Sequence, residues 1–393
     1  PLNWGLSKNA SLGSASILFL ANVPGSVFQQ PVNPAASRGA GGHKVQERAG
    51  EIMSAGASRR EDGAGRHDWL VGAAILIVAA AVRLYGIGRE PLWLDEGYSW
   101  WDAQQSLENL WRLVPQCDPH PPLYALLLKG WTEMFGDSVV ALRALGAAVS
   151  VAATGVVMLA GRELGRRIGW IAGLLFAVAP FQIEYAHEAR PYALVALGAA
   201  ATLFGALRVL RARQAPLVDA RAGWIAFVAG ATVMLWANNT SIFFLAAFGL
   251  FAAALFLVDR SSRSLVRPML YAAAVIGLLW LPYLPIYFEQ ARGISADFWI
   301  PRPDAWRVAN ELRFVVGMGE FHTLWLLLGI WAAGIGLAWR RGARREAGLL
   351  AAMVALPVAL NLGVSLTVKP IYLARAPETR TMKIVERLKP LHA

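Results

Sequence analysis

The sequence predicts an all-α protein that crosses a membrane many times. Hydrophobic residues make up 56% of the 393 residues and charged residues only 16%, whereas soluble domains carry about 25% charged residues. Long apolar runs alternate with short polar turns along most of the chain. Arginines gather in one alternate set of turns and carboxylates in the other, a pattern typical of polytopic membrane proteins.

The first 68 residues lack this pattern. They are rich in Gly, Ala and Ser with scattered charges, so they cannot bury an apolar core and are expected to form a disordered cytoplasmic leader. The chain opens on Pro1, and its first methionine, Met53, begins an ordinary leader-like segment. Residues 1–52 are therefore interpreted as an upstream extension that is not native to the fold.

About nine apolar runs approach the roughly 20 residues that a membrane span needs. They cover residues 69–88, 138–160, 168–183, 191–207, 224–237, 241–258, 268–288, 323–339 and 347–368. With their loops they form a transmembrane core over residues 69–372.

The charged turns predict the topology. Arginines occupy alternate turns: Arg162, Arg166 and Arg167; Arg208, Arg211, Arg213 and Arg221; Arg260, Arg263 and Arg267; Arg340, Arg341, Arg344 and Arg345. Such turns face the cytoplasm by the positive-inside rule, so the N-terminus is cytoplasmic and the opposite face is the outer, periplasmic one. This distribution explains the net charge of +11 without a nucleic-acid partner.

Two long loops lie on the predicted outer face, at about 89–137 and 289–321. Loops of this length in a compact protein are usually functional. Within the first, residues 98–113 and 121–135 have apolar residues at helical spacing and predict amphipathic helices along the membrane surface.

The C-terminal residues 373–393 form an atypical basic, polar tail. After nine spans from a cytoplasmic start this tail would lie outside, where basic residues are not expected. Either one span is miscounted, or the chain is truncated or altered after about Tyr372; the second alternative is favoured.

Ionisable side chains lie near the ends of the predicted spans rather than at mid-membrane depth. Those expected to converge at the outer boundary are Arg83, Asp95, Glu96, His120, Arg143, Glu184, His187, Glu188, Arg190 and Lys369. Transporters place ionisable groups deeper in the membrane. The belt therefore favours an enzyme that acts on a lipid-anchored substrate with a charged head.

Four stretches carry a family resemblance, in order along the chain: "RLYGIGREPLWLDEGYSW", "DPHPPLYALLLKGW", "ALRALGAAVS" and "YAHEARPYAL". Together they resemble bacterial polyprenyl-phosphate-sugar-dependent membrane glycosyltransferases of the C-type fold. Protein O-mannosyltransferases and the lipid A aminoarabinose transferase are relatives. The resemblance covers about residues 75–372. It implies inverting transfer of a sugar from a polyprenyl phosphate to an acceptor hydroxyl, in cell-envelope glycosylation at the bacterial inner (plasma) membrane.

Asp95 matches the first-loop aspartate of this family and is the candidate general base. Adjacent residues point about 100° apart on a helix, so Asp95 and Glu96 are not expected to form a facing pair. Glu96, also assigned to the catalytic pair, has three alternative roles: holding the acceptor, orienting Asp95, or contacting a metal.

The leaving phosphate needs positive charge, and Arg190, Arg143, Arg83 and Lys369 are the candidates, with Tyr372 beside the last. Arginine can grip phosphate with two parallel hydrogen bonds. The alternatives are that Arg83 and Arg143 extend to the membrane interface and that Arg190 forms an ion pair that pins its turn.

Six further residues are candidates for the substrate site or its support: His120, Asp118, Tyr124, His187, Glu188 and Tyr192. Four of them could together form a divalent-cation site: Asp118, His120, His187 and Glu188. Their spacing matches no zinc motif. No metal or other cofactor is expected to be obligatory, and a divalent cation is the alternative.

The expected partners are the lipid-phosphate sugar, membrane lipid and an acceptor that is a glycolipid, a polysaccharide or a protein. The sequence does not specify the sugar or the acceptor. A transporter or flippase of lipid-linked substrates, or a truncated inactive relative, is the competing interpretation.

Overall fold

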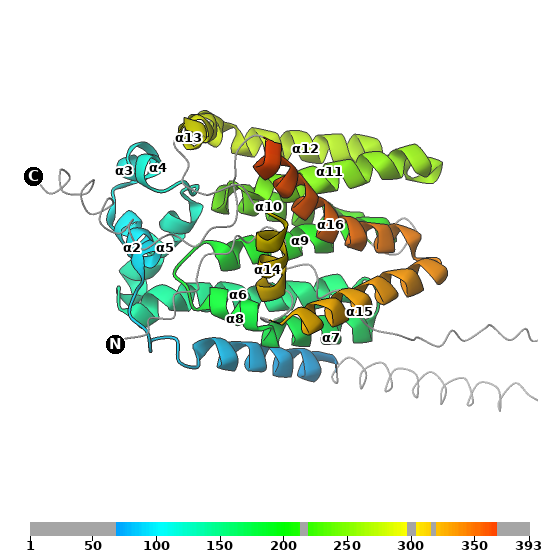
Figure 1. Ribbon diagram of the computed structural model, residues 1–393, viewed down its shortest axis with the longest axis horizontal. Coiled ribbons are helices and arrows are strands. Elements are labelled where there is room, and N and C mark those ends of the chain that lie inside the picture. The colour runs from blue at the N-terminus through cyan, green and yellow to red at the C-terminus, as the bar shows by residue number, and fades with distance from the viewer. Residues whose placement is uncertain (1–67, 213–218, 297–303, 316–319, 368–393) are drawn as a thin grey trace, which may run out of the picture.

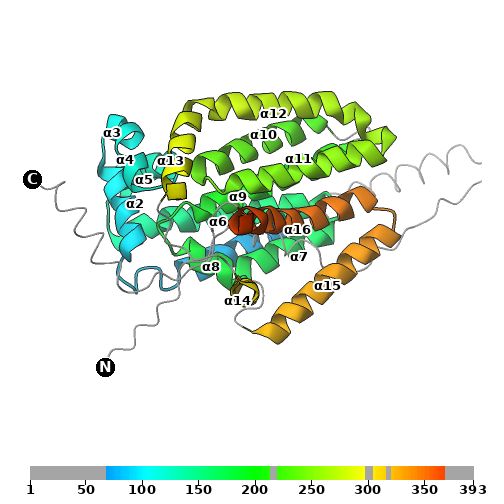
Figure 2. The ribbon, with the colours of Figure 1, turned by 45° about the horizontal axis from the view of Figure 1, so that its top comes forward.

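The computed structural model describes residues 68–212, 219–296, 304–315 and 320–367, and all regular secondary structure in these ranges is helical. The first helix spans residues 68–84. The following helices are α2 (Leu94–Gln104), α3 (Leu107–Arg112), α4 (Val114–Cys117), α5 (Leu123–Phe135), α6 (Val139–Arg162), α7 (Arg166–Val178), α8 (Pro180–Ala186), α9 (Tyr192–Ala212), α10 (Ala220–Ala237), α11 (Ser241–Val258), η2 (Arg260–Leu265), α12 (Val266–Trp280), η3 (Leu281–Tyr283), α13 (Leu284–Ala296), α14 (Ala305–Val315), α15 (Phe321–Arg340) and α16 (Arg344–Thr367). Most long helices run side by side, and α2 to α5 gather at one end of them (Figures 1 and 2).

The described residues contain seven helices that are long and apolar enough to cross a membrane, or eight if the bent pair α7–α8 counts as one span. The expected number was about nine. All nine predicted runs coincide with helices, and the first of them falls on the helix of residues 68–84. The all-α polytopic membrane fold is thus confirmed.

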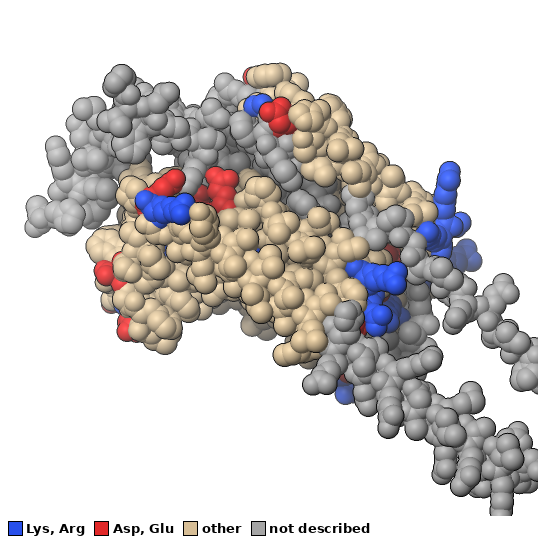
Figure 3. Space-filling model, turned by 90° about the horizontal axis from the view of Figure 1, so that it is seen from below, with Lys and Arg blue, Asp and Glu red and all other residues tan. Residues whose placement is uncertain are grey.

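The two ends of the helix bundle differ in charge. We call one the loop end: it holds α2–α5, the α8–α9 turn, the α10–α11 turn and α13. The other is the arginine end, where Arg208 pairs with Glu163 at 2.9 Å and Arg345 with Asp259 at 2.7 Å. Figure 3 shows blue side chains gathered mainly at this second end, while the flanks of the helices are almost free of charge.

The first long loop folds into four helices. Its second half forms α5, close to the predicted helix 121–135. The predicted helix 98–113 is present as two shorter helices, because the chain breaks between α2 and α3. Ser106 causes this break: its hydroxyl accepts the Asn109 N–H at 3.2 Å and starts a new helix, as N-cap serines commonly do.

Helices α7 and α8 form one bent element, with an angle of 59° at Ala179. Pro180 has no N–H, so the helix cannot supply the usual hydrogen bond to the Phe176 carbonyl four residues earlier. Arg83 supplies the missing donors: its Nη2 lies 3.3 Å from the Phe176 oxygen and its Nη1 2.8 Å from the Ala177 oxygen. The arginine thus satisfies the carbonyls that the bend exposes.

Glycines allow helices α9 and α10 to pack closely. Gly198 faces Gly230 and Gly205 faces Gly223, both pairs lying across the antiparallel helix contact. A Cβ on Gly205 would lie 2.4 Å from the Gly223 carbonyl oxygen, which is shorter than any van der Waals contact. Small residues at such spacing are a common means of packing membrane helices.

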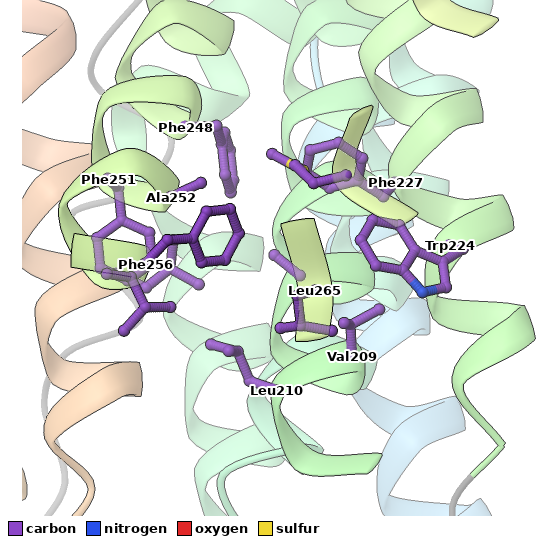
Figure 4. Close-up of a pocket in the computed structure, with 13 residues that line it drawn as sticks. Val209, Leu210, Trp224, Phe227, Phe248, Phe251, Ala252, Phe256 and Leu265 are labelled. Atoms are coloured by element: carbon purple, nitrogen blue, oxygen red, sulfur yellow. The ribbon is translucent and has the colours of Figure 1, made fainter. Parts of the chain in front are cut away.

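The main hydrophobic core lies between α9, α10, α11, α12 and α16. Figure 4 shows the aromatic side chains Trp224, Phe227, Phe248, Phe251 and Phe256 around a cavity of about 50 Å³. The side chains that line it are apolar, and an apolar cavity of this kind stays dry. This part of the molecule therefore serves stability, and the polar chemistry lies at the helix ends.

Candidate active site

Helix α2 carries the two predicted carboxylates, Asp95 and Glu96, in its first turn. The partial positive charge of a helix N-terminus favours carboxylates there. Oε2 of Glu96 accepts a hydrogen bond from the Trp93 backbone N–H at 3.2 Å, which caps the helix. Asp95 points about 100° away from Glu96 and meets a different set of neighbours.

Glu96, with 0% of its surface exposed, pairs with Arg143 of α6. Arg143 Nε donates to Oε1 at 2.8 Å and Nη2 donates to Oε2 at 2.7 Å. The Ala189 N–H adds a bond to Oε1 at 2.9 Å. The other N–H groups of Arg143 donate to the carbonyls of Ile87, Glu90 and Pro91. All five donors of this guanidinium are engaged, so the pair ties α2 to α6 and to the α8–α9 turn.

Arg190 is the centre of a second cluster, beside Asp95. Its Nη1 lies 3.0 Å from the Asp95 carbonyl oxygen, 3.1 Å from Ser99 Oγ and 3.1 Å from Asp118 Oδ2. Burial disfavours the charged guanidinium, but the neighbouring acids, Asp118 foremost, hold the pKa of Arg190 above its ordinary value. Its Nε is buried and has no hydrogen-bond partner among the described residues. This donor is therefore unused, but the protein encloses it, so a ligand can reach it only if a neighbouring side chain moves.

The "DPHPP" segment closes this cluster from the side of the first loop. Oδ1 of Asp118 accepts the His120 N–H at 2.9 Å and also contacts His120 Nδ1. Nη2 of Arg190 lies 3.1 Å from the same Nδ1, so this ring nitrogen either donates to the carboxylate or accepts from the guanidinium. Burial alone would raise the pKa of Asp118, but His120 and Arg190 together lower it below its ordinary value. Asp118 is therefore a permanent anion that orients both neighbours.

Asp95 differs from the other carboxylates of the site because its side chain is only partly buried. No described residue donates a hydrogen bond to its carboxylate. Burial raises the pKa of Asp95, Asp118 and Glu96 add to this effect, and Arg190 and His120 oppose it. A carboxylate with a raised pKa and an open face is suited to accept a proton from a hydroxyl.

A third carboxylate, Asp102, lies on the face of α2 that carries Asp95, seven residues further on. Burial, and next the charge of Asp118, raise the pKa of Asp102 to about 8, and its Oδ1 has no hydrogen-bond partner among the described residues. Burial also raises the pKa of the neighbouring Tyr98. Neither residue was among the predicted site residues, although the i, i+7 spacing of the two aspartates was a usable signal.

Gln290 of α13 holds the "DPHPP" segment from outside the first loop. Its Nε2 donates to the Pro115 carbonyl at 2.9 Å, and its Oε1 accepts from Asn239 Nδ2 at 3.0 Å and from the Tyr283 hydroxyl at 2.9 Å. Asn239 also donates to the Pro119 carbonyl at 2.7 Å. This contact could not be predicted from a local pattern, because it joins residues 175 positions apart.

The remaining predicted residues of the α8–α9 region lie around Arg190. Tyr192 lies beside this arginine, and Tyr124 is close to it and to Glu188. The Tyr124 hydroxyl is buried without a hydrogen-bond partner among the described residues, and burial raises the pKa of Tyr124 above its ordinary value. His187 is the C-cap of α8. The structure thus brings Tyr124 of α5 close to the segment 187–192, which holds His187, Glu188, Arg190 and Tyr192.

Arg83, another predicted phosphate-binding residue, lies away from the Arg190 cluster. Arg83 is fully buried against Ser150 and the α7 carbonyls; it does not extend to the interface and is not part of the Arg190 cluster. Lys369 and Tyr372 fall outside the described residues. Within the described part of the chain, no three His, Cys, Asp or Glu side chains gather as a metal site, and the expectation that no metal is required stays a prediction.

The arrangement combines a partly exposed carboxylate, Asp95, with a buried cation, Arg190, that has an unused donor. Such a pair can remove a proton from one reactant and stabilise negative charge on another. This chemistry is that of transfer to a hydroxyl with an anionic leaving group.

Comparison with known proteins agrees with this chemistry. Residues 119–286 match the model of the dolichyl-phosphate-mannose-protein mannosyltransferase family. The matched segment runs from "PHPP" to α13 and contains His120, Arg143 and Arg190, whereas Asp95 and Glu96 precede it. No curated protein matches the chain. The similarity to this mannosyltransferase family supports a membrane glycosyltransferase that uses a polyprenyl-phosphate sugar.

Proposed function

We propose that the protein transfers a sugar, with inversion, from a polyprenyl phosphate to an acceptor hydroxyl at the loop end of the helix bundle. The observation that carries this proposal is the position of Asp95 beside Arg190, with a carboxylate that no described residue engages. The match to the mannosyltransferase family supports the donor class.

In the proposed reaction Asp95 takes the proton of the acceptor hydroxyl while the hydroxyl oxygen bonds to the anomeric carbon. The bond from this carbon to the phosphate oxygen breaks, and its electron pair leaves on the phosphate. Arg190 stabilises that charge through the positive charge of its guanidinium, which Asp118 and His120 keep in place. Donor and acceptor bound side by side supply the entropic part of the acceleration.

The roles of the other arginines and of Glu96 follow from their hydrogen bonds. Arg143 has no N–H left for a phosphate, so we assign the Glu96–Arg143 pair to orienting α2 and hence Asp95. Arg83 is assigned to the α7 bend. Lys369 and Tyr372 stay proposed contacts of the phosphate.

The placement in the membrane is part of the proposal. The arginine end is the cytoplasmic one by the positive-inside rule, which puts Asp95 at the outer, periplasmic boundary of a bacterial inner membrane. A glycolipid, a polysaccharide or a protein is the acceptor at that face, within cell-envelope glycosylation. Membrane lipid surrounds the site.

The test is a transfer assay with the full-length protein in liposomes, a radiolabelled polyprenyl-phosphate sugar and an acceptor extract. Asp95→Asn is expected to lower the transfer rate by about 10²- to 10⁴-fold, since it removes the base. Glu108→Gln is the matched control, because Glu108 pairs with Arg112 on the exposed surface of the same loop. Equal rates for the wild type and Asp95→Asn overturn the mechanism. Flipping of the lipid without transfer favours the transporter alternative.

The pH dependence of the same assay gives an independent measurement. A base must be deprotonated, so the rate falls as the pH drops through the pKa of Asp95. Because that pKa is raised, the acid loss is expected at a higher pH than for an ordinary aspartate. A rate that stays flat down to about pH 4, the ordinary range of aspartate, contradicts this role.

A further inference from the structure

A large cavity lies at the arginine end, away from the candidate active site. It has a volume of about 960 Å³ and lies between the α6–α7 turn, the end of α9 and the α15–α16 turn. Helix α6 runs from Arg143, at the candidate active site, to Arg162, at this cavity, a distance of about 30 Å at 1.5 Å per residue. The cavity therefore lies too far from the candidate active site to be part of it.

Positive charge dominates the cavity wall. Four arginines line it, Arg162, Arg166, Arg208 and Arg211, against two carboxylates, Glu163 and Glu346. A third carboxylate, Asp68, pairs with Arg166 at 3.5 Å, so the positive excess is one charge. A concave wall with excess positive charge concentrates anions. The charge balance of the lining thus fits an anionic ligand.

Glu163 fixes two of these arginines in the wall. Its side chain is only 5% exposed, and its two oxygens lie 2.9 Å from Arg208 Nη1 and 3.2 Å from Arg211 Nη1. Arg208 Nε also donates to the Asp219 carbonyl at 3.2 Å. These guanidinium groups are therefore held by a buried carboxylate, and they are not freely moving surface side chains. Such pre-organisation lowers the entropic cost of binding an anion.

The rest of the lining includes apolar side chains, Leu159, Leu164, Phe204 and Leu207. They come from the ends of membrane-spanning helices, at the level where lipid headgroups meet water. A small inorganic anion gains nothing from such walls, whereas a lipid headgroup with the start of its chains can contact the arginines and the apolar surface together.

We propose that this cavity binds the phosphate headgroup of an anionic phospholipid. The proposal is independent of the transferase activity at the opposite end. It assigns the basic α6–α7 turn and the arginines at the end of α9 a role beyond topology, since a lipid held there connects α6, α9 and the α15–α16 turn.

The experiment measures binding of a fluorescent short-chain phosphatidylglycerol to the purified full-length protein in neutral detergent. Phosphatidylglycerol is expected to bind at least ~10-fold more tightly than phosphatidylcholine with the same chains. Arg162→Gln with Arg166→Gln, both exposed positions at the cavity, is expected to weaken phosphatidylglycerol binding by about 10-fold, or about 1.4 kcal/mol. If the double variant does not fold, the single variant Arg162→Gln replaces it in the experiment. This variant is also expected to weaken phosphatidylglycerol binding.

Arg260→Gln with Arg267→Gln is the matched control, because both arginines are exposed at the same end and do not line the cavity. Unchanged binding in this control supports the proposal. Equal affinity for the two lipids, or no loss in the Arg162 variants, overturns it. Displacement by low millimolar inorganic phosphate also overturns it, because the site is then one for free anions.

Discussion

Asp95 and Glu96 are neighbours in the sequence and have opposite environments. Glu96 is enclosed by Arg143 and two backbone N–H groups, whereas the Asp95 carboxylate has no such bond to a described residue. Helix geometry explains the difference, since one residue faces α6 and the other faces Arg190. One acid therefore stabilises the fold, and its neighbour is available for proton transfer.

At the residue scale, Asp102 predicts a pH-dependent stability. An aspartate in an unfolded chain has a pKa of about 3.9, and the folded value is about 8. The folded protein thus holds the proton between these values, and its free energy of unfolding falls as the pH rises from about 4 to about 8. Asp102→Asn cannot ionise, so we expect its thermal unfolding midpoint to exceed that of the wild type by about 2–6 °C at pH 9.

At about pH 3 the two proteins are expected to unfold at nearly the same temperature, because the wild-type side chain is then mostly neutral in both states. The measurement is thermal unfolding of the detergent-solubilised proteins at both pH values. An equal shift at both pH values means that ionisation of Asp102 is not the cause.

The sequence was a better guide to which residues belong to the site than to which residues they hydrogen-bond. Helix periodicity was enough to expect that Asp95 and Glu96 point apart. Arg143 donates hydrogen bonds to carbonyls more than 50 residues away. Arg83 donates hydrogen bonds to carbonyls that a bend in another helix exposes. A local pattern contains no information on such tertiary hydrogen bonds.

At the scale of elements, hydropathy was sufficient for the spans and insufficient for the loop helices. Apolar runs of about 20 residues have few alternatives to a helix in a membrane. The break between α2 and α3 depends on one serine cap, Ser106, and the bend at Pro180 depends on Arg83 for its missing hydrogen bonds. Such single-residue effects determine where short helices begin and end.

The α9–α10 contact predicts the effect of a single added methyl group. In Gly205→Ala the new Cβ would lie 2.4 Å from the Gly223 oxygen and 2.5 Å from the Phe227 nitrogen. The helices must then separate, and we expect a loss of about 1–3 kcal/mol in unfolding free energy. Thermal unfolding in detergent measures it.

Gly249→Ala in α11 is the control, since no atom lies within 4 Å of its new Cβ. Alanine is favoured over glycine in a helix by about 1 kcal/mol, so this variant is expected to be as stable as the wild type or slightly more stable. Equal losses in the two variants contradict close packing as the cause.

At the scale of the whole molecule, the helices separate two kinds of chemistry. The loop end gathers residues from the first loop, the α8–α9 turn, the α10–α11 turn and α13 into one polar cluster. The arginine end holds the basic turns and the cavity. The charge pattern predicted this separation, while the closeness of Asp118, Arg190 and Gln290 required the fold.

Cys117 gives a test of which face of the membrane carries the site. It is the only cysteine in the sequence and is exposed at the loop end. An impermeant maleimide is expected to label it in intact cells. Burial, with Asp102 and Asp118 nearby, raises the pKa of its thiol, so labelling is measured at about pH 8.5, where more thiolate is present.

The control is Arg260→Cys in a Cys117→Ser background, which places the thiol at the arginine end. This protein is expected to react only after the cells are permeabilised. The reverse pattern would place the site on the cytoplasmic face.

The position of Arg83 also affects how the chain is made. A guanidinium in an apolar helix is costly to insert without hydrogen-bond partners, and the acceptor of Arg83 in Ala177 is synthesised 94 residues later. The helix of residues 68–84 is therefore expected to remain close to the insertion machinery until α7 has emerged. Biogenesis of the segment from residue 68 to residue 178 is then a concerted event, in which its early and late helices enter the bilayer together.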